Sequence, residues 1–451
     1  MKGILVVFMT KYLLDTSGAR APMSDTEATI WYHAFVMAVY FFPIAGAILS
    51  DAFWGKYRTI LTLSIVYCLG HLALALDLTR VGLFLGLALI SIGSGGIKPC
   101  VSAHVGDQFG KSNEHLLSRV FAWFYLSINV GAAISTMLTP ALLSSERWGP
   151  HWAFGIPGAL MVAATFVFWL GRNRFVHVPP SGWRSVWQTV TSPDGLTAIR
   201  NLTVIYLFVA VFWSMFDQTG STWVLQAERM DRTWHVAGWF PGWMNAASWL
   251  PAQLQTVELL PAQIQTANPV LILILVPLFA YVVYPLINLV FPLTPLRKIG
   301  LGFLLCSASF AIVAWTQRLI DAGQRPDIGW QLLAYIVLTA SEVMVSITGL
   351  EFSYTQAPKP MKSFVMSLWL LSVAVGNAVT TGVNYAILKE DGSSRLAGDD
   401  YFWFFSLLML ATAVVFVVFA MRYRGKSYIQ DEAPVVAADG RDPEAAGNRA
   451  E

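Results

Sequence analysis

Two charged side chains lie inside apolar runs that are long enough to cross a membrane. Lys98 stands in the segment GSGGIKPC, and Glu351 stands in SITGLEFSYTQAP. An ionisable group at membrane depth is costly, so each is a candidate for function. The ammonium of Lys98 can bind a substrate carboxylate. The carboxylate of Glu351 can bind a substrate ammonium, or take up a proton because burial disfavours its charged form. The alternative for both residues is an ion pair within the protein.

A histidine and an aspartate lie nearer the ends of two other apolar runs. His33 is found in IWYHAFVMAVYFFP and Asp217 in FWSMFDQTGSTW. Imidazole is the side chain that changes its charge near neutral pH. We expect Asp217 to pair with His33 across the two halves of the protein, in a contact that loosens when the acid is protonated. The alternatives are a structural histidine and an acid that only reaches water at the end of its helix.

Two amides also need partners at membrane depth: Asn129 in FYLSINVGA and Asn268 in TANPVL. A buried amide without a hydrogen bond is costly. A peptide backbone suits an amide because it offers both donors and acceptors. A hydrogen bond to a neighbouring helix would satisfy each amide equally well.

A short loop after the run that carries His33 holds Asp51, Gly55, Lys56 and Arg58. This spacing resembles the signature of major facilitator proteins, in which an acid and basic residues lock the cytoplasmic side. A short basic loop also follows from the excess of positive charge on the cytoplasmic side of membrane proteins in general.

Eleven predicted membrane-spanning helices carry these residues. Each has roughly 20 residues or more, the length that crosses about 30 Å of hydrocarbon. The predicted spans are 28–50, 58–76, 81–103, 119–143, 152–170, 202–224, 264–290, 299–317, 332–356, 363–388 and 401–422. The apolar opening segment 1–14 reaches only about 21 Å as a helix. We expect it to be the second half of a twelfth helix.

Composition agrees with a membrane protein. Only 12% of the residues are charged, against about 25% in soluble proteins. The net charge of +2 gives no argument for nucleic acid binding. The sequence shows no clustered metal-ligand motif, nucleophile elbow or phosphate loop, so we expect neither an enzyme nor a bound cofactor.

The expected architecture is an all-α polytopic membrane protein of the major facilitator type, with two six-helix bundles. Fifteen Lys and Arg residues fall on one side of the predicted topology and nine on the other, which favours both termini in the cytoplasm. The expected regions are the N-terminal bundle 1–170, whose first helix is incomplete, a cytoplasmic linker 171–200, the C-terminal bundle 201–424 with an outer loop 226–262, and a disordered tail 425–451.

The longest motifs resemble those of the proton-dependent oligopeptide transporter (POT, or PTR) family of the major facilitator superfamily, and the chain is similar to its bacterial members. GSGGIKPCVSAHVGDQF and FYLSINVGA resemble the two signature regions of this family. DQTGSTWVLQA and EVMVSITGLEFSYTQAP resemble its seventh and tenth helices, and the segment 31–60 resembles its second helix.

The resemblance implies a proton-coupled symporter that imports di- and tripeptides across the cytoplasmic (inner) membrane by alternating access. It implies protons as the coupling ion, no other cofactor, and function as a monomer. Lys98 would hold the peptide carboxylate and Glu351 the peptide amino group. The implied substrate-binding residues are Lys98, Glu351, Asn129, Asn268, Tyr32, Tyr40 and Trp223. The residues implied in proton coupling and gating are His33, Asp217, Lys98, Glu351, Asp51 and Arg58.

The chain departs from the family pattern at its start. Family members carry an ExxER-type motif in the first half of helix one, which ends in a Gly-Met pair, and Met1 resembles the methionine of that pair. We expect a misassigned start codon; the alternative is a truncated carrier with impaired coupling.

Three other functions stay open from the sequence. The chain can be a family relative that carries nitrate or another small anion, although the presence of Glu351 argues against this. It can also be an impaired carrier, or a sensor or scaffold that binds peptide without transporting it.

Overall fold

The computed structural model describes residues 2–108, 117–177, 179–180, 182–235, 256–356, 362–389 and 394–423. Most of the expected outer loop 226–262 and the whole expected tail 425–451 lie outside the described residues.

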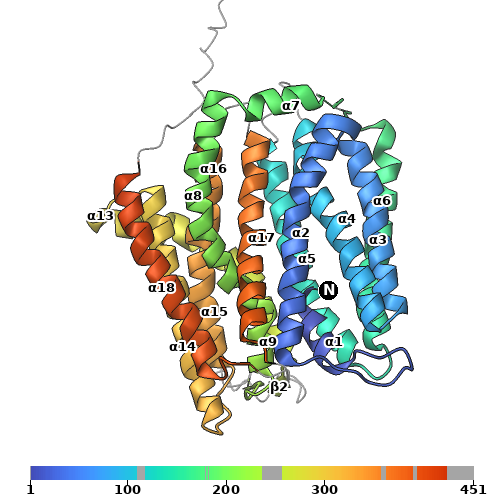
Figure 1. Cartoon of the computed structure of the whole chain (residues 1–451), viewed down its shortest axis with the longest axis vertical. Helices are drawn as coiled ribbons and strands as arrows, with labels where there is room; N and C mark the ends of the chain where they lie inside the picture. The colour runs from blue at the N-terminus through green and yellow to red at the C-terminus, as the bar shows by residue number, and fades with distance from the viewer. Residues whose placement is uncertain are drawn as a thin grey trace, which may run out of the picture.

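Eleven helices in the described part of the chain are long and apolar enough to cross a membrane, which confirms the eleven predicted spans. They run side by side along the long axis of the molecule (Figure 1). The one sheet among the described residues consists of two three-residue strands, β1 (Thr233–His235) and β2 (Thr256–Glu258), which pair in antiparallel fashion.

The first half of the chain begins with a short 3-10 turn and continues through six helices. These are η1 (Lys2–Ile4), α1 (Leu5–Lys11), α2 (Asp25–Ile48) with the π-helical segment η2 (Leu49–Trp54), α3 (Lys56–Leu76), α4 (Arg80–Asp107), α5 (Leu117–Ser144) and α6 (Gly149–Leu170). The connection to the second half contains η4 (Gly171–Asn173) and the eight-residue helix α7 (Trp183–Val190).

The second half contains six further spans, several of which are interrupted. Its elements are α8 (Pro193–Phe216), η5 (Asp217–Gly220) and α9 (Thr222–Ala227), then η8 (Pro261–Thr266), α12 (Ala267–Leu278), η9 (Phe279–Val283) and α13 (Tyr284–Val290), then α14 (Pro295–Asp321), α15 (Gly329–Glu342), η10 (Val343–Ile347), α16 (Thr348–Gln356), α17 (Lys362–Ile387) and α18 (Asp399–Arg422).

Each half buries its own hydrophobic core. The first core is built around Phe8, Tyr32 and Phe154, and the second contains Phe303 and Phe405, both with 0% exposure. Two separate cores make two bundles, which we call the N-terminal and the C-terminal bundle.

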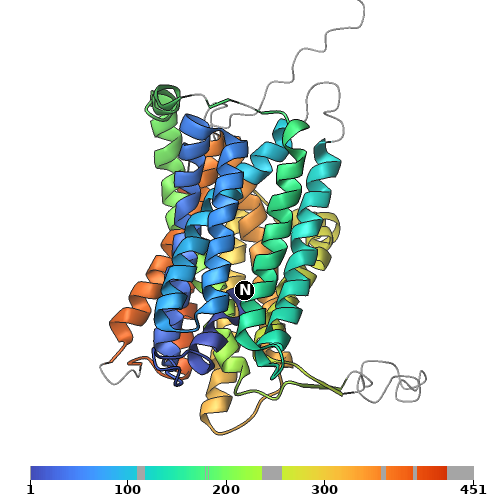
Figure 2. The ribbon, with the colours of Figure 1, turned by 90° about the vertical axis from the view of Figure 1, so that its right-hand side faces the viewer.

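The two ends of the molecule carry different elements. Figure 1 shows α7 at one end, which we call the linker end, and β2 at the other, which we call the strand end. Figure 2 shows the same two ends from the side. In the middle of the molecule α2 of the N-terminal bundle packs along α17 of the C-terminal bundle, so these two helices form much of the boundary between the bundles (Figure 1).

Several of the described spans depart from regular α-helix in ways that hydropathy does not reveal. Three π-helical segments, η2, η9 and η10, interrupt the second, eighth and tenth spans. The seventh span changes to a 3-10 turn at Asp217–Gly220. Such interruptions free backbone groups and rotate the following side chains, and they often occur at functional sites.

Two glycines let α2 and α4 approach closely within the N-terminal bundle. A Cβ atom placed on Gly46 would lie 2.3 Å from the Cα atom of Gly96. No side chain fits there, because the obstacle is backbone rather than a flexible side chain. The helix that carries Lys98 is therefore held firmly against the helix that carries His33.

Replacing Gly46 with alanine should destabilise the N-terminal bundle by about 1–3 kcal/mol, the usual cost of overpacking a tight contact. Thermal unfolding in detergent micelles would show this as a lower apparent Tm. The matched control is Gly382→Ala in α17, where a Cβ atom meets nothing within 4 Å. Equal stability of the two variants would contradict the close packing of α2 on α4.

Candidate functional site

A buried carboxylate, that of Asp217, joins the two bundles in the strand-end half of the molecule. Asp217 begins the 3-10 turn η5 where the regular helix α8 ends, and it is only 4% exposed. Its Oδ1 atom lies 2.5 Å from the Nζ atom of Lys2 in the first turn of the chain. The ion pair therefore ties the start of the N-terminal bundle to the seventh span.

The second oxygen of this carboxylate is held by an amide. Asn377 on α17 donates from Nδ2 to Oδ2 of Asp217 at 2.6 Å, and its Oδ1 atom accepts from Nδ1 of His33 on α2 at 2.7 Å. Because an amide oxygen can only accept, the proton of this second bond belongs to the imidazole. Asn377 thus connects an acid and a histidine of opposite bundles.

The other ring nitrogen of His33 faces a hydroxyl group. Its Nε2 atom lies 3.0 Å from Oγ of Ser221. The same Oγ atom lies 3.4 Å from the carbonyl oxygen of Gln218. A hydroxyl can donate to neutral imidazole, or rotate toward the carbonyl and accept from imidazolium. The site therefore accommodates both charge states of His33 without losing its hydrogen bonds.

The expectation of a direct pair between His33 and Asp217 is wrong in this structure. The amide of Asn377 lies between them, and the cation that touches Asp217 is Lys2. The reason is geometric: α17 lies next to α2 at this depth, so a side chain of α17 reaches both groups.

Two further ion pairs join the bundles near the strand end. Lys11 pairs with Glu228 at 2.9 Å, and Arg229 pairs with Asp25 at 3.3 Å. The second pair is more than half exposed on both sides, so it contributes little on its own. With the pair of Lys2 and Asp217, three ionic contacts between the bundles lie in the strand-end half of the described structure.

Two predicted pocket residues are buried in this conformation. Tyr32 is 1% exposed and lies next to Gly220, where an added Cβ atom would come within 1.9 Å of the phenol oxygen. Trp223 is completely buried in the C-terminal core, against the rings of Phe310 and Tyr335. Tyr32 thus packs where the two bundles meet, and Trp223 packs inside one of them.

The charge of Lys98 is met by an aromatic ring. Its Nζ atom lies 3.9 Å from the centre of the Tyr40 ring, and the lysine is exposed. An ammonium over a ring face is stabilised by the negative face of the ring without being neutralised. The cation therefore remains available to an anionic ligand, and the structure brings the two predicted residues Lys98 and Tyr40 together.

Asn268 hydrogen-bonds to an acid on a neighbouring helix, Glu342. Its Nδ2 atom donates to Oε2 of Glu342 at 2.7 Å and to Oγ1 of Thr339 at 3.2 Å. Glu342 is partly exposed at the end of α15. The backbone of Glu351 belongs to α16, but its side chain lies outside what the structure describes.

A regular helix would place Glu342 and Glu351 on nearly opposite faces, since they are nine residues apart. The π-helical segment Val343–Ile347 lies between them, so the two residues do not follow the angular spacing of a regular α-helix. The wider turn rotates α16 relative to α15.

The remaining predicted residues lie apart from this cluster. Asn129 is half-buried on α5, Asp51 lies in η2 and accepts from Ser50 Oγ at 3.1 Å, and Arg58 is exposed in the first turns of α3. At this linker end an ion pair of 2.7 Å joins Lys56 to Asp107. Among the described residues, no three His, Cys, Asp or Glu side chains gather where they can hold a metal ion.

The sequence did not single out Lys2 or Asn377, and it favoured only a packing or interdomain role for Glu342. Each carries the signal that identified the other candidates, a charge or amide next to or within an apolar run. Lys2 lies in the short opening segment 1–14, and Asn377 lies among several polar residues of the span 363–388, so neither stands out locally.

Replacing Asn377 with leucine should weaken closure of the strand end, because the bond it donates is to a charged group and such bonds contribute about 1.5–3 kcal/mol. Distances between spin labels on Ser17 and Gln324, both exposed in loops at that end, would become longer and broader. The control is Asn384→Leu, a buried asparagine of the same helix whose partners, Thr380 and Tyr401, belong to its own bundle. Unchanged distances in the first variant would contradict a latch through Asn377.

Several known proteins are similar to this chain in sequence. Solute carrier family 15 member 2 of Homo sapiens is 32% identical over 400 residues, which cover 78% of this chain and 51% of that protein. Peptide transporter family 1 of Drosophila melanogaster is 33% identical over 358 residues, covering 70% of this chain and 44% of that protein. The chain thus spans about half the length of these curated relatives.

Solved structures match over nearly the whole chain. An auto-inhibited POT family peptide transporter superposes with a TM-score of 0.81 at 33% identity, covering 96% of this chain and 95% of that one. The POT family transporter PepTSo superposes with a TM-score of 0.78, also at 33% identity, covering 94% of each chain. The sequence profile of the POT family (PTR2) matches residues 57–183 and 181–403. With a family profile across most of its length, this chain belongs to the POT family.

Proposed function

We propose that this protein is a proton-coupled symporter that imports di- and tripeptides across the cytoplasmic membrane by alternating access. The observation that carries the proposal is the buried chain of polar groups, from Lys2 through Asp217 and Asn377 to His33, at the boundary of two bundles. A carrier that couples protons to movement needs titratable groups where its halves separate. Membership of the POT family, and the similarity to peptide transporter family 1 of Drosophila melanogaster, support the choice of substrate.

The proposed orientation places the strand end outside the cell and the linker end in the cytoplasm. The excess of basic residues in the loops of the linker end supports it. Three ionic contacts join the bundles in the strand-end half. In this orientation the conformation described here is closed toward the outside.

Lys98 is the proposed partner of the peptide carboxylate. It is exposed, and among the described side chains its ammonium contacts the ring of Tyr40 rather than an acid. A carboxylate can therefore approach without displacing an existing ion pair. Asn129, on the neighbouring α5, is proposed to contact the backbone or a terminus of the same peptide.

Glu342 is the proposed partner of the peptide amino group, in place of Glu351. Its carboxylate is partly exposed and is oriented by the amide of Asn268 at 2.7 Å. An ammonium can bind the oxygen atoms that the amide leaves available. Glu342 lies where α15 passes into η10. Binding of the peptide amino group can therefore change the conformation of the interrupted tenth helix.

Protonation of Asp217 is the proposed trigger for opening. A neutral acid loses its ionic attraction to Lys2, and the two bundles then lose the most buried of their three ionic contacts. His33 can take up a second proton at Nε2, the nitrogen that faces Ser221, while its Nδ1–H bond to Asn377 is kept. The proton thereby favours a state that is open at the strand end.

Proteoliposomes should take up labelled dialanine faster when an inward proton gradient is imposed. Excess unlabelled dipeptide should compete, and nitrate should not. A control with a protonophore, which dissipates the gradient, distinguishes gradient-driven uptake from peptide that is only bound. Uptake that ignores the gradient would contradict symport, and binding without uptake would favour a sensor.

Glu342→Gln should reduce uptake of dialanine by about tenfold or more, since the charge-assisted bond to the amino group is lost. Acetyl-dialanine, which has no free amino group, is the substrate control and should be affected less. Glu351→Gln is the matched variant nine residues along the same span. If Glu351→Gln abolished uptake while Glu342→Gln did not, the assignment to Glu342 would be wrong.

A further inference from the structure

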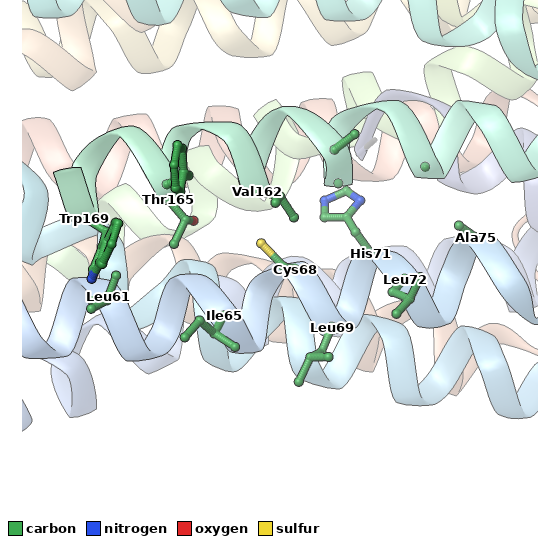
Figure 3. A pocket seen from close by; sticks show the side chains of 14 residues that line it. Leu61, Ile65, Cys68, Leu69, His71, Leu72, Ala75, Val162, Thr165 and Trp169 are labelled. Carbon is green, nitrogen blue, oxygen red and sulfur yellow. The ribbon is translucent and has the colours of Figure 1, made fainter.

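A long apolar groove lies on the N-terminal bundle between α3 and α6. It has a volume of about 760 Å³ and runs along α3 from Leu61 to Ala75 (Figure 3). Fourteen residue-to-residue steps at about 1.5 Å each give it a length of about 21 Å. Small residues of α6, Gly155 and Ala159, leave the space that the groove occupies.

One ring nitrogen of a histidine in this groove has no hydrogen-bond partner among the described residues. His71 is 1% exposed, and its Nδ1 atom lies 3.0 Å from the carbonyl oxygen of Phe154. The carbonyl can only accept, so Nδ1 carries the proton and Nε2 bears a lone pair. Among the described residues nothing forms a hydrogen bond with Nε2.

The other polar groups of the groove differ from His71. The hydroxyl of Thr165 already donates to the carbonyl oxygen of Met161 at 2.7 Å. Cys68, whose thiol is only weakly polar, lies between His71 and Thr165 (Figure 3). The lone acceptor in an otherwise apolar channel is therefore Nε2 of His71, and buried acceptors without a partner are rare.

We propose that the groove binds one membrane lipid that carries a free hydroxyl group beside an apolar body. The hydroxyl would donate to Nε2 of His71, and the apolar body would lie along α3 toward Leu61 and Trp169. Both walls of the groove are candidate membrane spans, so its occupant comes from the bilayer.

The depth of His71 agrees with this placement. It lies five residues before the end of α3 at Leu76, which is about 7.5 Å along the helix axis. A hydroxyl at the boundary between headgroups and hydrocarbon reaches this level. The volume lies within the range of about 300–1,000 Å³ that is typical of small-molecule sites.

The groove is separate from the peptide site, because both of its walls belong to one bundle. The proposal therefore does not rest on the proposed function. Its occupant would fill the packing between α3 and α6 rather than the boundary at which the bundles move.

Photolabelling of the full chain in lipid nanodiscs tests the proposal. The probe is a long-chain monoacylglycerol with a diazirine on its acyl chain, and its control is the same molecule with both hydroxyl groups methylated. Peptides labelled by the free-hydroxyl probe should map to α3 and α6. Their yield should exceed that of the methylated probe about three- to tenfold, the effect of one hydrogen bond.

Gly155→Leu should abolish this labelling by filling the groove. The variant should fold, because a Cβ atom at Gly155 meets only that of Ala75, at 3.8 Å. Gly382→Leu, with nothing within 4 Å, is the matched control and should retain it. His71→Phe should reduce the yield to that of the methylated probe.

Three results would overturn the proposal. They are equal labelling by the two probes, labelling that persists in Gly155→Leu, and cross-linking of two copies through Cys68 with a bismaleimide. The last result would assign the groove to a second copy of the chain. The Cys68 thiol is partly exposed, whereas Cys100 and Cys306 are buried, so the reagent reports on the groove.

Discussion

The carboxylate of Asp217 is the group on which the closed conformation depends. A buried charge is costly unless it is paired and hydrogen-bonded, and removing one partner costs more than the pair itself contributes. Asp217 takes its partners from η1 and α17, so the first turn and the eleventh span must both remain in place. The ion pairs Lys11–Glu228 and Arg229–Asp25 are more exposed and add to the contact at Asp217 without replacing it.

Irregular backbone lies beside the residues that are proposed to act in coupling and peptide binding. The turn at Asp217 ends α8, and the segment Val343–Ile347 follows Glu342 directly. A straight α-helix offers its side chains at fixed angles, whereas a π-helical or 3-10 segment changes the angle partway along a span. Both proposed sites of the C-terminal bundle therefore sit where one rigid piece of helix passes into another.

The spans could be predicted from the sequence, because crossing a membrane requires a length and a hydropathy that local sequence records. The candidate residues could be predicted for the same reason, since a charge in an apolar run is conspicuous. Their partners could not. Lys2 and Asp217 are 215 positions apart, and no local pattern records which helices become neighbours. The expected direct pairing of His33 with Asp217 failed on this point. The helical phase that separates Glu342 from Glu351 is altered by the π-helical segment Val343–Ile347, which no local sequence pattern reveals.

The uninterrupted course of α2 between His33 and Tyr40 has a thermodynamic consequence. The two residues are seven positions apart, which is about two turns, so they share a face of one stiff rod. One end of this rod touches Asn377, and the other supports the ammonium of Lys98. If an anion at Lys98 shifts α2, the affinity of His33 for a proton changes. By reciprocity, a proton at His33 then changes the affinity of Lys98 for the anion by the same factor. A single helix can thus exchange free energy between the two ligands without any contact between them.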